Sequence, residues 1–254
     1  MGILDTYNRQ GYVVVPGVVD RELVREAGNH VDWLMKKNPG VRPERLSMGL
    51  IDAFWLRLVG DDRLLDVAEK FIGPNIALFS SQYISKPPHD GMLVPWHQDG
   101  SYWPLDPMEV VTLWLAVDDA DCENGCMRVI PGTQQMQLQE LRENRDERSV
   151  FKREMNPSLV DESKAVDIVL KAGDVEVHHP NIIHGSCANT SPRRRCGLTI
   201  RYIPTSTRIT EANWPASFLL RGHPVSGIND YLPRPKYVAG ECFAFRDCEK
   251  WAGN

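Results

Sequence analysis

The chain has 254 residues, of which 42% are hydrophobic and 25% are charged, and its formal net charge at pH 7 is -5. This composition suits one globular domain with a sizeable core. The acidic balance, with a pI near 5.8, gives no basic footprint for nucleic acid. We therefore expect no nucleic-acid partner. No apolar run approaches the length of a membrane span, so we also expect no membrane partner.

The first residues and the cysteines bear on location. Residues 1–5 contain neither a basic segment nor an apolar signal core. The six cysteines show no Cys-x-x-Cys spacing, and a chain of this size needs no disulfide bonds. We therefore expect reduced thiols in a cytoplasmic protein, whose oligomeric state the sequence leaves open.

The N-terminal part predicts a strand followed by two helices. Residues 11–15 are typical of a short strand, and Asp20 can cap the first helix. A second helix starts at Asp61 or Asp62 and stops before Gly73-Pro74. The residues expected on the buried helix faces are Leu23, Val24, Ala27, Val31 and Leu34, then Leu64, Leu65, Ala68, Phe71 and Ile72.

From residue 76 onward, short β-rich segments alternate with Gly, Pro and Asp turns. These segments are 76–85, 110–117, 126–130, 166–170, 174–178 and 197–203. Such a series favours a β-sandwich or barrel with the N-terminal helices packed outside. We expect a single domain with a helical cover over roughly 1–75, a β core over roughly 76–205 and a C-terminal extension over 206–254.

A charged, weakly periodic segment lies between Gln134 and Ser163. Long excursions of this kind often lie over an active site. A solvated surface helix and loop would explain its charges equally well, so none of them is assigned to substrate.

The most informative motif is Trp96-His97-Gln98-Asp99-Gly100. A His and an Asp two apart on a β-strand point to the same face and can hold one metal ion. The best third ligand is His184, which we expect just after a second strand and turn. Two His and one carboxylate on one face of a metal are the arrangement that non-haem Fe(II) oxygenases use.

Each of these residues also has an ordinary interpretation. A His-x-Asp pair alone is more often a polar pair on a solvated strand, and a lone His is usually an unremarkable core or surface residue. His178 and His179, a few residues upstream of His184, compete for the role of third ligand or serve a structural one. The order of the motifs, an early pair, a distal His and then a cation, favours the metal site.

The last predicted strand carries that cation. By alternation, one strand face holds Leu198, Ile200 and Tyr202, and the other holds Arg195, Gly197, Thr199 and Arg201. An arginine that faces the barrel interior is costly unless an anion meets it. A dicarboxylate cosubstrate with one end on the metal and the other on Arg195 would meet that requirement.

Several motifs occur in order along most of the chain: Ile84-Ser85-Lys86-Pro87-Pro88, Trp96-His97-Gln98-Asp99, Asn124-Gly125-Cys126, Val129-Ile130-Pro131-Gly132-Thr133, and His184-Gly185-Ser186 with Arg195 beyond it. Together they resemble the phytanoyl-CoA dioxygenase family of Fe(II)/2-oxoglutarate-dependent oxygenases. The resemblance implies a mainly β fold, a double-stranded β-helix or cupin-like jelly roll. It also implies that His97, Asp99 and His184 bind Fe(II).

For the cosubstrate, the resemblance implies Arg195 on the distal carboxylate of 2-oxoglutarate, with Lys86, Trp114 and Ser186 at or near it. Gln82 is added because it shares a strand face with Lys86 by parity. Without the resemblance, ordinary roles stand for these residues: a lysine that reaches water, a core tryptophan and a serine that caps a turn.

The reaction implied by the resemblance uses O2 and converts 2-oxoglutarate to succinate and CO2 while an unactivated C–H bond of a small organic molecule is oxidised. Hydroxylation is the default. Related halogenases replace the carboxylate ligand with Gly or Ala, so Asp99 disfavours halogenation. Desaturation, epoxidation and cyclisation use the same iron chemistry and stay open, as do a cupin-type enzyme without 2-oxoglutarate and a non-catalytic metal-binding jelly-roll protein.

The substrate is not determined by the fold. A mixed C-terminal set could line a pocket or pack outside the roll: Trp214, Phe218, Leu219, Arg221, His223, Tyr231 and Tyr237. Residues 201–205 resemble stretches in oxygenases that tailor natural products. We therefore favour a natural-product or amino-acid-like substrate over a fatty acyl-CoA.

Overall fold

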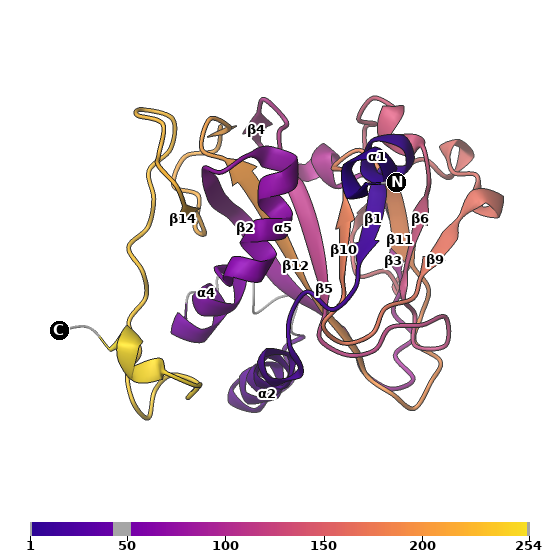
Figure 1. Cartoon of the computed structure of the whole chain (residues 1–254). Helices are drawn as coiled ribbons and strands as arrows, with labels where there is room; N and C mark the ends of the chain where they lie inside the picture. Colours follow the sequence, from indigo (N-terminus) through magenta and orange to yellow (C-terminus); the bar gives the residue numbers. More distant parts are fainter. Residues whose placement is uncertain (1, 43–51, 253–254) are drawn as a thin grey trace.

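Two antiparallel sheets form the centre of the molecule, and helices cover the outer face of the larger one (Figure 1). This computed structural model describes residues 2–42 and 52–252. The sheets face each other as a jelly roll, which confirms the expectation of a mainly β fold with flanking helices.

The larger sheet has six strands in the order β1-β10-β5-β12-β2-β14 and the smaller has four in the order β3-β11-β6-β9. The strands of the larger sheet are β1 (Tyr12–Val15), β10 (Val175–His178), β5 (Val111–Ala116), β12 (Arg195–Pro204), β2 (Ile76–Lys86) and β14 (Phe218–Arg221). Those of the smaller are β3 (Val94–His97), β11 (Ile183–Ser186), β6 (Met127–Ile130) and β9 (Val166–Ile168). Two short ribbons pair β4 (Leu105–Asp106) with β13 (Arg208–Ile209), and β7 (Arg142–Glu143) with β8 (Arg153–Glu154).

The α-helices in the described ranges are α1 (Ile3–Gln10), α2 (Arg21–Lys37), α4 (Ala53–Val59) and α5 (Asp62–Ile72). Asp20 and Asp61 cap α2 and α5 as the sequence predicted, each side chain accepting a hydrogen bond from a backbone N–H of the first turn. The sequence analysis did not predict α1 and α4. Both are short, and the almost wholly apolar run of α4 lacks the periodicity that marks an amphipathic helix.

Strand β12 separates the apolar core from the interior of the roll. Its side chains alternate as expected: Leu198 and Ile200 join the core that the helices cover, whereas Arg195 and Arg201 line the interior. The strand is buried along its whole length because it pairs with β2 on one side and β5 on the other. The positively charged side chains of Arg195 and Arg201 therefore lie in the interior of the roll.

The C-terminal segment divides between the two roles that the sequence left open. Trp214 lines a cavity inside the roll, whereas Phe218 is part of the core against the helices. Arg221 forms ion pairs with carboxylates of α5. The residues after β14 run past α4 on the outside of the molecule (Figure 1).

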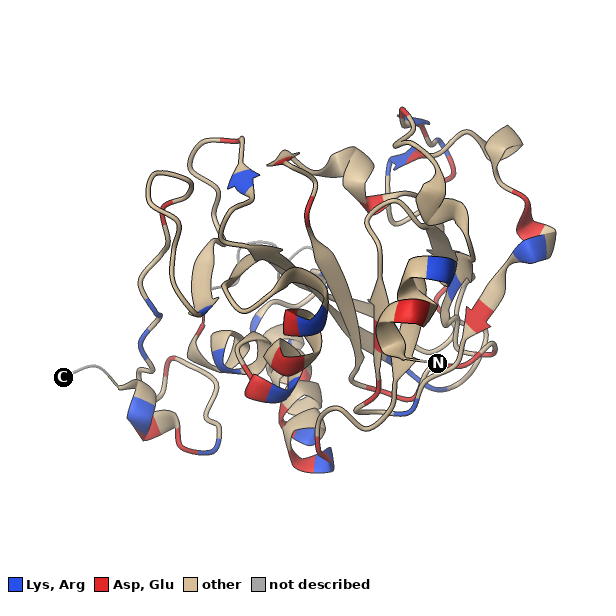
Figure 2. Cartoon of the chain, turned by 45° about the horizontal axis from the view of Figure 1, so that its top comes forward, with Lys and Arg blue, Asp and Glu red and all other residues tan. Residues whose placement is uncertain are grey.

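Charged residues are interspersed in sign along the exposed faces of the helices (Figure 2). Within the two described ranges, none of the helices combines the length and hydrophobicity that crossing a bilayer demands.

Asp52 joins two helices to the sheet, and its replacement tests this contact. Its carboxylate caps α4 at Trp55 N, 2.7 Å away, and accepts a hydrogen bond from Nε2 of the buried His30 of α2, 2.8 Å away. We expect Asp52→Ala to lower the free energy of unfolding by about 2 to 4 kcal/mol, from the lost cap and from the Nε2 atom of His30 that loses its partner. Urea unfolding measures this loss. Asp20→Ala, which removes a cap and an exposed ion pair, should cost about 1 kcal/mol; equal losses would contradict the role of His30.

Candidate active site

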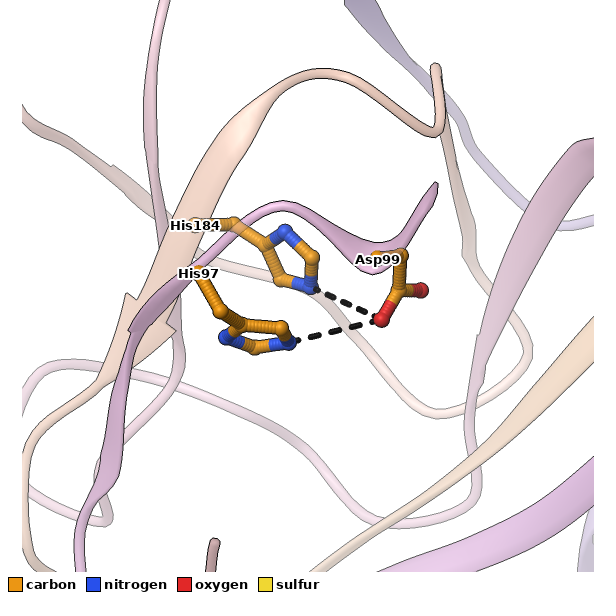
Figure 3. Close-up of side chains that lie close together, drawn as sticks. All are labelled: His97, Asp99 and His184. Carbon is orange, nitrogen blue, oxygen red and sulfur yellow. Dashed lines mark ion pairs between the residues drawn. The ribbon is translucent and has the colours of Figure 1, made fainter. Parts of the chain in front are cut away.

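Three buried side chains converge where β3 meets β11. The two strands pair in a register that places His184 directly opposite His97, with the imidazole centroids 4.1 Å apart. Nε2 of His97 lies 3.4 Å, and Nε2 of His184 4.0 Å, from Oδ1 of Asp99 (Figure 3). The ligand atoms of the three residues all lie within 4.8 Å of one another, so one metal ion could bind to all of them.

The local backbone differs from the sequence-based expectation in two ways. Strand β3 ends at His97, and Asp99 is the first residue of a 3-10 helix, η2 (Asp99–Tyr102). The expectation that strand alternation brings the pair to one face was therefore wrong, and the turn after the strand brings Asp99 back toward His97. His184 lies inside β11, not after a strand and turn.

Backbone carbonyls fix the tautomer of both histidines. Nδ1 of His97 lies 2.8 Å from Pro95 O, and Nδ1 of His184 lies 3.2 Å from Ile182 O. Because a carbonyl only accepts, each Nδ1 donates, and each Nε2 keeps a lone pair directed at the cluster. Burial, reinforced by the neighbouring His97, holds the pKa of His184 well below its usual value. The donor set thus fits a divalent cation.

Asp99 stays ionised although it is buried. Burial alone raises the pKa of its carboxyl, but the charge of Arg201 and then the neighbouring His178 outweigh burial and hold the pKa well below its usual range. Nε of Arg201 lies 3.6 Å and Nε2 of His178 lies 3.7 Å from Oδ2, the oxygen turned away from the two Nε2 atoms. The carboxylate therefore presents one oxygen to the metal position and the other to cations.

The structure places His178 and His179 in other roles. Nδ1 of His178 is 2.7 Å from Oε2 of the buried Glu176. Burial lowers the pKa of His178, but Glu176 and Asp99 outweigh it and raise the pKa to about 9, so its ring is protonated and has no lone pair for a metal. His179 accepts a hydrogen bond from the backbone N–H of Asn181. Both belong outside the cluster of possible ligands.

The far end of the same cleft is cationic. Arg195 donates from Nε to Gly125 O at 3.1 Å and from Nη2 to Ser186 Oγ at 3.4 Å. Lys86 lies behind Ser186 and donates to its hydroxyl at 2.7 Å and to Cys187 O. Burial, and then the charge of Arg195, lower the pKa of Lys86 to about 6. Arg195 carries a buried positive charge beside this hydroxyl, and Lys86 can take up a proton there, so a carboxylate would complete the site.

Trp114 forms one wall of this cleft and depends on a glycine. The ring lies 5.5 Å from the Arg195 guanidinium, and a Cβ at Gly197 would come 2.0 Å from Cζ2 of the ring. Only glycine therefore lets the indole lie against β12. Gln82, which the sequence analysis grouped with Lys86, borders a neighbouring cavity instead of this cleft.

Some residues at the site were not assigned from the sequence. Phe151, from the charged excursion, stands edge-on to His97 at 5.2 Å between centroids and lines the cleft. Tyr102 follows in η2, 5.9 Å from the same imidazole. The signal for Phe151 was the length of the excursion, which did lead over the site, but no pattern in it singled out the aromatic residue.

A jelly roll that holds two histidines and a carboxylate together, with cations at the far end of the cleft, defines a class of protein, the non-haem iron oxygenases with a 2-His-1-carboxylate site. The model of the family described as Phytanoyl-CoA dioxygenase (PhyH) matches residues 7–197. The chain belongs to this family, which confirms the resemblance seen in the sequence, and it is an Fe(II)/2-oxoglutarate-dependent dioxygenase.

Among similar proteins is L-proline trans-4-hydroxylase of Streptomyces griseoviridis, 28% identical over 86% of this chain and 87% of that protein. Phytanoyl-CoA dioxygenase 1 of Oryza sativa subsp. japonica is 36% identical over 54% of this chain, but the match spans only 49% of the rice protein. Among solved structures, the non-heme monooxygenase ThoJ has a TM-score of 0.76 at 23% identity, covering 92% of this chain and 88% of its own. The epimerase SnoN in complex with Fe3+, alpha ketoglutarate and nogalamycin RO has a TM-score of 0.66 at 22% identity, covering 94% and 95%. These two structures share the fold.

Replacing Gly197 tests the position of Trp114. We expect Gly197→Ala to displace the indole and to weaken 2-oxoglutarate binding at least about tenfold, because an overpacked site costs roughly 1 to 3 kcal/mol. Equilibrium titration of the metal-loaded protein with 2-oxoglutarate measures this, with Gly91→Ala, where an added Cβ would meet open space, as the control. An unchanged affinity in Gly197→Ala would remove Trp114 from the wall of the cosubstrate site.

Proposed function

We propose that His97 Nε2, His184 Nε2 and Asp99 Oδ1 bind the catalytic Fe(II). The observation that carries this assignment is the convergence of three buried donor atoms, with the pKa of Asp99 and the pKa of His184 both held below their usual values. Both imidazoles are held by Nδ1–H bonds to carbonyls, the usual support for metal-binding histidines.

We propose further that Arg195 binds the distal carboxylate of 2-oxoglutarate. Ser186 and Trp114 line the same cleft as the three metal-binding residues, and Lys86 supports the hydroxyl of Ser186 from behind. The arrangement suits a molecule that reaches from the metal to the cationic end. Gln82 borders the adjoining cavity, and its expected contact with the cosubstrate stays a prediction.

Fe(II) with 2-oxoglutarate bound supplies the oxidation of an unactivated C–H bond, coupled to the release of succinate and CO2. The protein's own contribution is placement. The backbone carbonyls of residues 95 and 182 hold the imidazoles in one tautomer, Arg201 and His178 hold the Asp99 carboxylate ionised, and the rings of Trp114 and Phe151 exclude water from the cleft.

Hydroxylation is the proposed outcome because Asp99 occupies the ligand position that a halogenase leaves open. The similarity to an L-proline hydroxylase over most of both chains supports hydroxylation of an amino-acid-like or natural-product molecule. The rice relative's name favours an acyl-CoA substrate, but the match spans about half of that protein. Desaturation, epoxidation and cyclisation remain alternative outcomes at the same site. We propose a cytoplasmic location, consistent with the free cysteines.

Removal of single ligands tests the iron site. We expect His184→Ala to abolish, and Asp99→Ala to weaken, the weak visible charge-transfer band that forms when Fe(II) and 2-oxoglutarate are added without oxygen, because each change removes one of the three ligands. Absorption spectroscopy and succinate release check this. His223→Ala, at an exposed position, serves as the control. A full band in both ligand variants would show that the metal binds elsewhere.

The low pKa of Lys86 gives cosubstrate binding a dependence on pH. With a pKa of about 6, Lys86 is mostly neutral at neutral pH, and a carboxylate bound nearby would raise its pKa. Binding should therefore take up a proton above about pH 6, and 2-oxoglutarate affinity should fall as pH rises toward about 8. Calorimetry at saturating Mn(II), in buffers of different ionisation enthalpy, counts the protons. Lys86→Met should abolish the uptake; wild-type binding without proton uptake would refute the role of Lys86.

A further inference from the structure

We propose that this enzyme recognises its substrate by a carboxylate group, which Arg201 binds at the inner end of an aromatic pocket beside Asp99. The proposal rests on the function proposed above and adds the substrate class: small organic acids whose apolar body is about the size of one ring.

The pocket adjoins the metal cleft. It has a volume of about 540 Å³, within the usual range of small-molecule sites. Asp99, Phe151 and Arg201 line both this pocket and the cleft that holds the three metal-binding residues. A molecule in the pocket therefore lies beside Asp99 and next to the metal position, where a C–H bond would have to be placed for oxidation.

Aromatic side chains form the walls. Phe79 and Trp214 are stacked with their ring centroids 4.6 Å apart, and the indole N–H of Trp214 donates a hydrogen bond to Phe79 O at 2.6 Å. Trp103 meets Phe79 edge-on at 5.8 Å. Tyr102 and Phe151 complete the lining. Rings held by one another in this way offer a preformed apolar surface for a ring-sized body.

Arg201 supplies the charge. Arg201 is only 7% exposed to solvent, and its guanidinium carbon lies 5.3 Å from the centroid of the Trp103 ring. One hydrogen bond, from Nη1 to Thr199 Oγ1 at 3.1 Å, holds it in place. Nε has no hydrogen-bond partner among residues 2–42 and 52–252. That nitrogen faces Oδ2 of Asp99 at 3.6 Å without a hydrogen bond, and a buried guanidinium so sparsely bonded at a cavity wall is costly unless a ligand supplies acceptors.

The positions of the charged side chains around the cleft and the pocket support the same role for Arg201. Arg195, with Lys86 behind Ser186, lies at the cosubstrate end of the cleft, so Arg201 is the arginine that borders the aromatic pocket. Within the described part of the chain, Asp99 is the only carboxylate within 4.0 Å of Arg201. A substrate carboxylate would give this guanidinium a second anionic partner.

A carboxylate fits this position better than a larger anion. The planar fork of one arginine matches two carboxylate oxygens, whereas a phosphate dianion calls for more than one cation. The other polar residues of the wall, Ser80, Ser81 and Gln82, are neutral, and Glu211 lies at the exposed outer part. Thioesters of coenzyme A, in which the carboxylate is blocked, fall outside the proposed class.

Matched pairs of acids and amides test the proposal. The probes are phenylacetate, 3-phenylpropanoate, cyclohexanecarboxylate and L-proline, each with its primary amide. They are titrated into protein loaded with Mn(II) and saturating 2-oxoglutarate, which occupies the Arg195 site. Paramagnetic relaxation of the probe protons reports both affinity and closeness to the metal. We expect at least one acid to bind the wild type about thirtyfold more tightly than its amide, as for a buried charge pair.

The variants assign that preference to Arg201. The acid-to-amide ratio should fall near one in Arg201→Met and to an intermediate value in Arg201→Lys, and it should persist in Arg208→Met, whose arginine lies on an exposed strand. Trp214→Ala should weaken binding of the ring-bearing acids while their preference over amides persists. The proposal is overturned if no acid is preferred in the wild type, or if Arg201→Met keeps the ratio. Failure of the wild type to bind Mn(II) and 2-oxoglutarate would instead refute the proposed function.

Discussion

The pairing of β11 with β3 is the constraint on which the site depends. Its register sets His184 opposite His97, and two backbone carbonyls then fix both tautomers. A shift of one residue would turn one imidazole to the other face of the sheet. Because η2 starts directly after β3, the same register also decides where Asp99 meets the two rings. The metal position is therefore a property of strand pairing more than of any single side chain.

Burial of the Asp99 carboxylate organises the charges around it. A carboxylate without water is stable only beside cations, and here Arg201 and His178 share its outer oxygen while the imidazoles meet the inner one. Glu176 keeps His178 protonated from behind. Arg201 extends this network into the aromatic pocket. The same guanidinium thus links the metal centre to the place where we propose that a substrate carboxylate binds.

Sequence patterns predicted the features that depend on local periodicity, namely the alternation of side chains along a strand and the capping of helices. Alternation along β12 correctly separated Arg195 and Arg201 from the apolar core, and the capping residues of α2 and α5 followed from local chemistry. Alternation failed at Asp99 because a turn, not the strand, sets its direction. The close fit of Gly197 to Trp114 and the approach of Phe151 arise from contacts between distant segments, which no local pattern encodes. The place of Arg201 between Asp99 and the aromatic pocket likewise depends on segments that are distant in the sequence.

Anomalous diffraction from crystals grown without oxygen in Fe(II) and 2-oxoglutarate tests the central claim most directly. Data collected at the iron absorption edge should show one strong peak bonded to Nε2 of His97, Nε2 of His184 and Asp99, with the distal carboxylate of 2-oxoglutarate on Arg195. A peak at a different place would contradict the account. The group of Cys122, Cys126 and Asp167, whose ligand atoms also lie within 4.8 Å of one another, is the specific alternative.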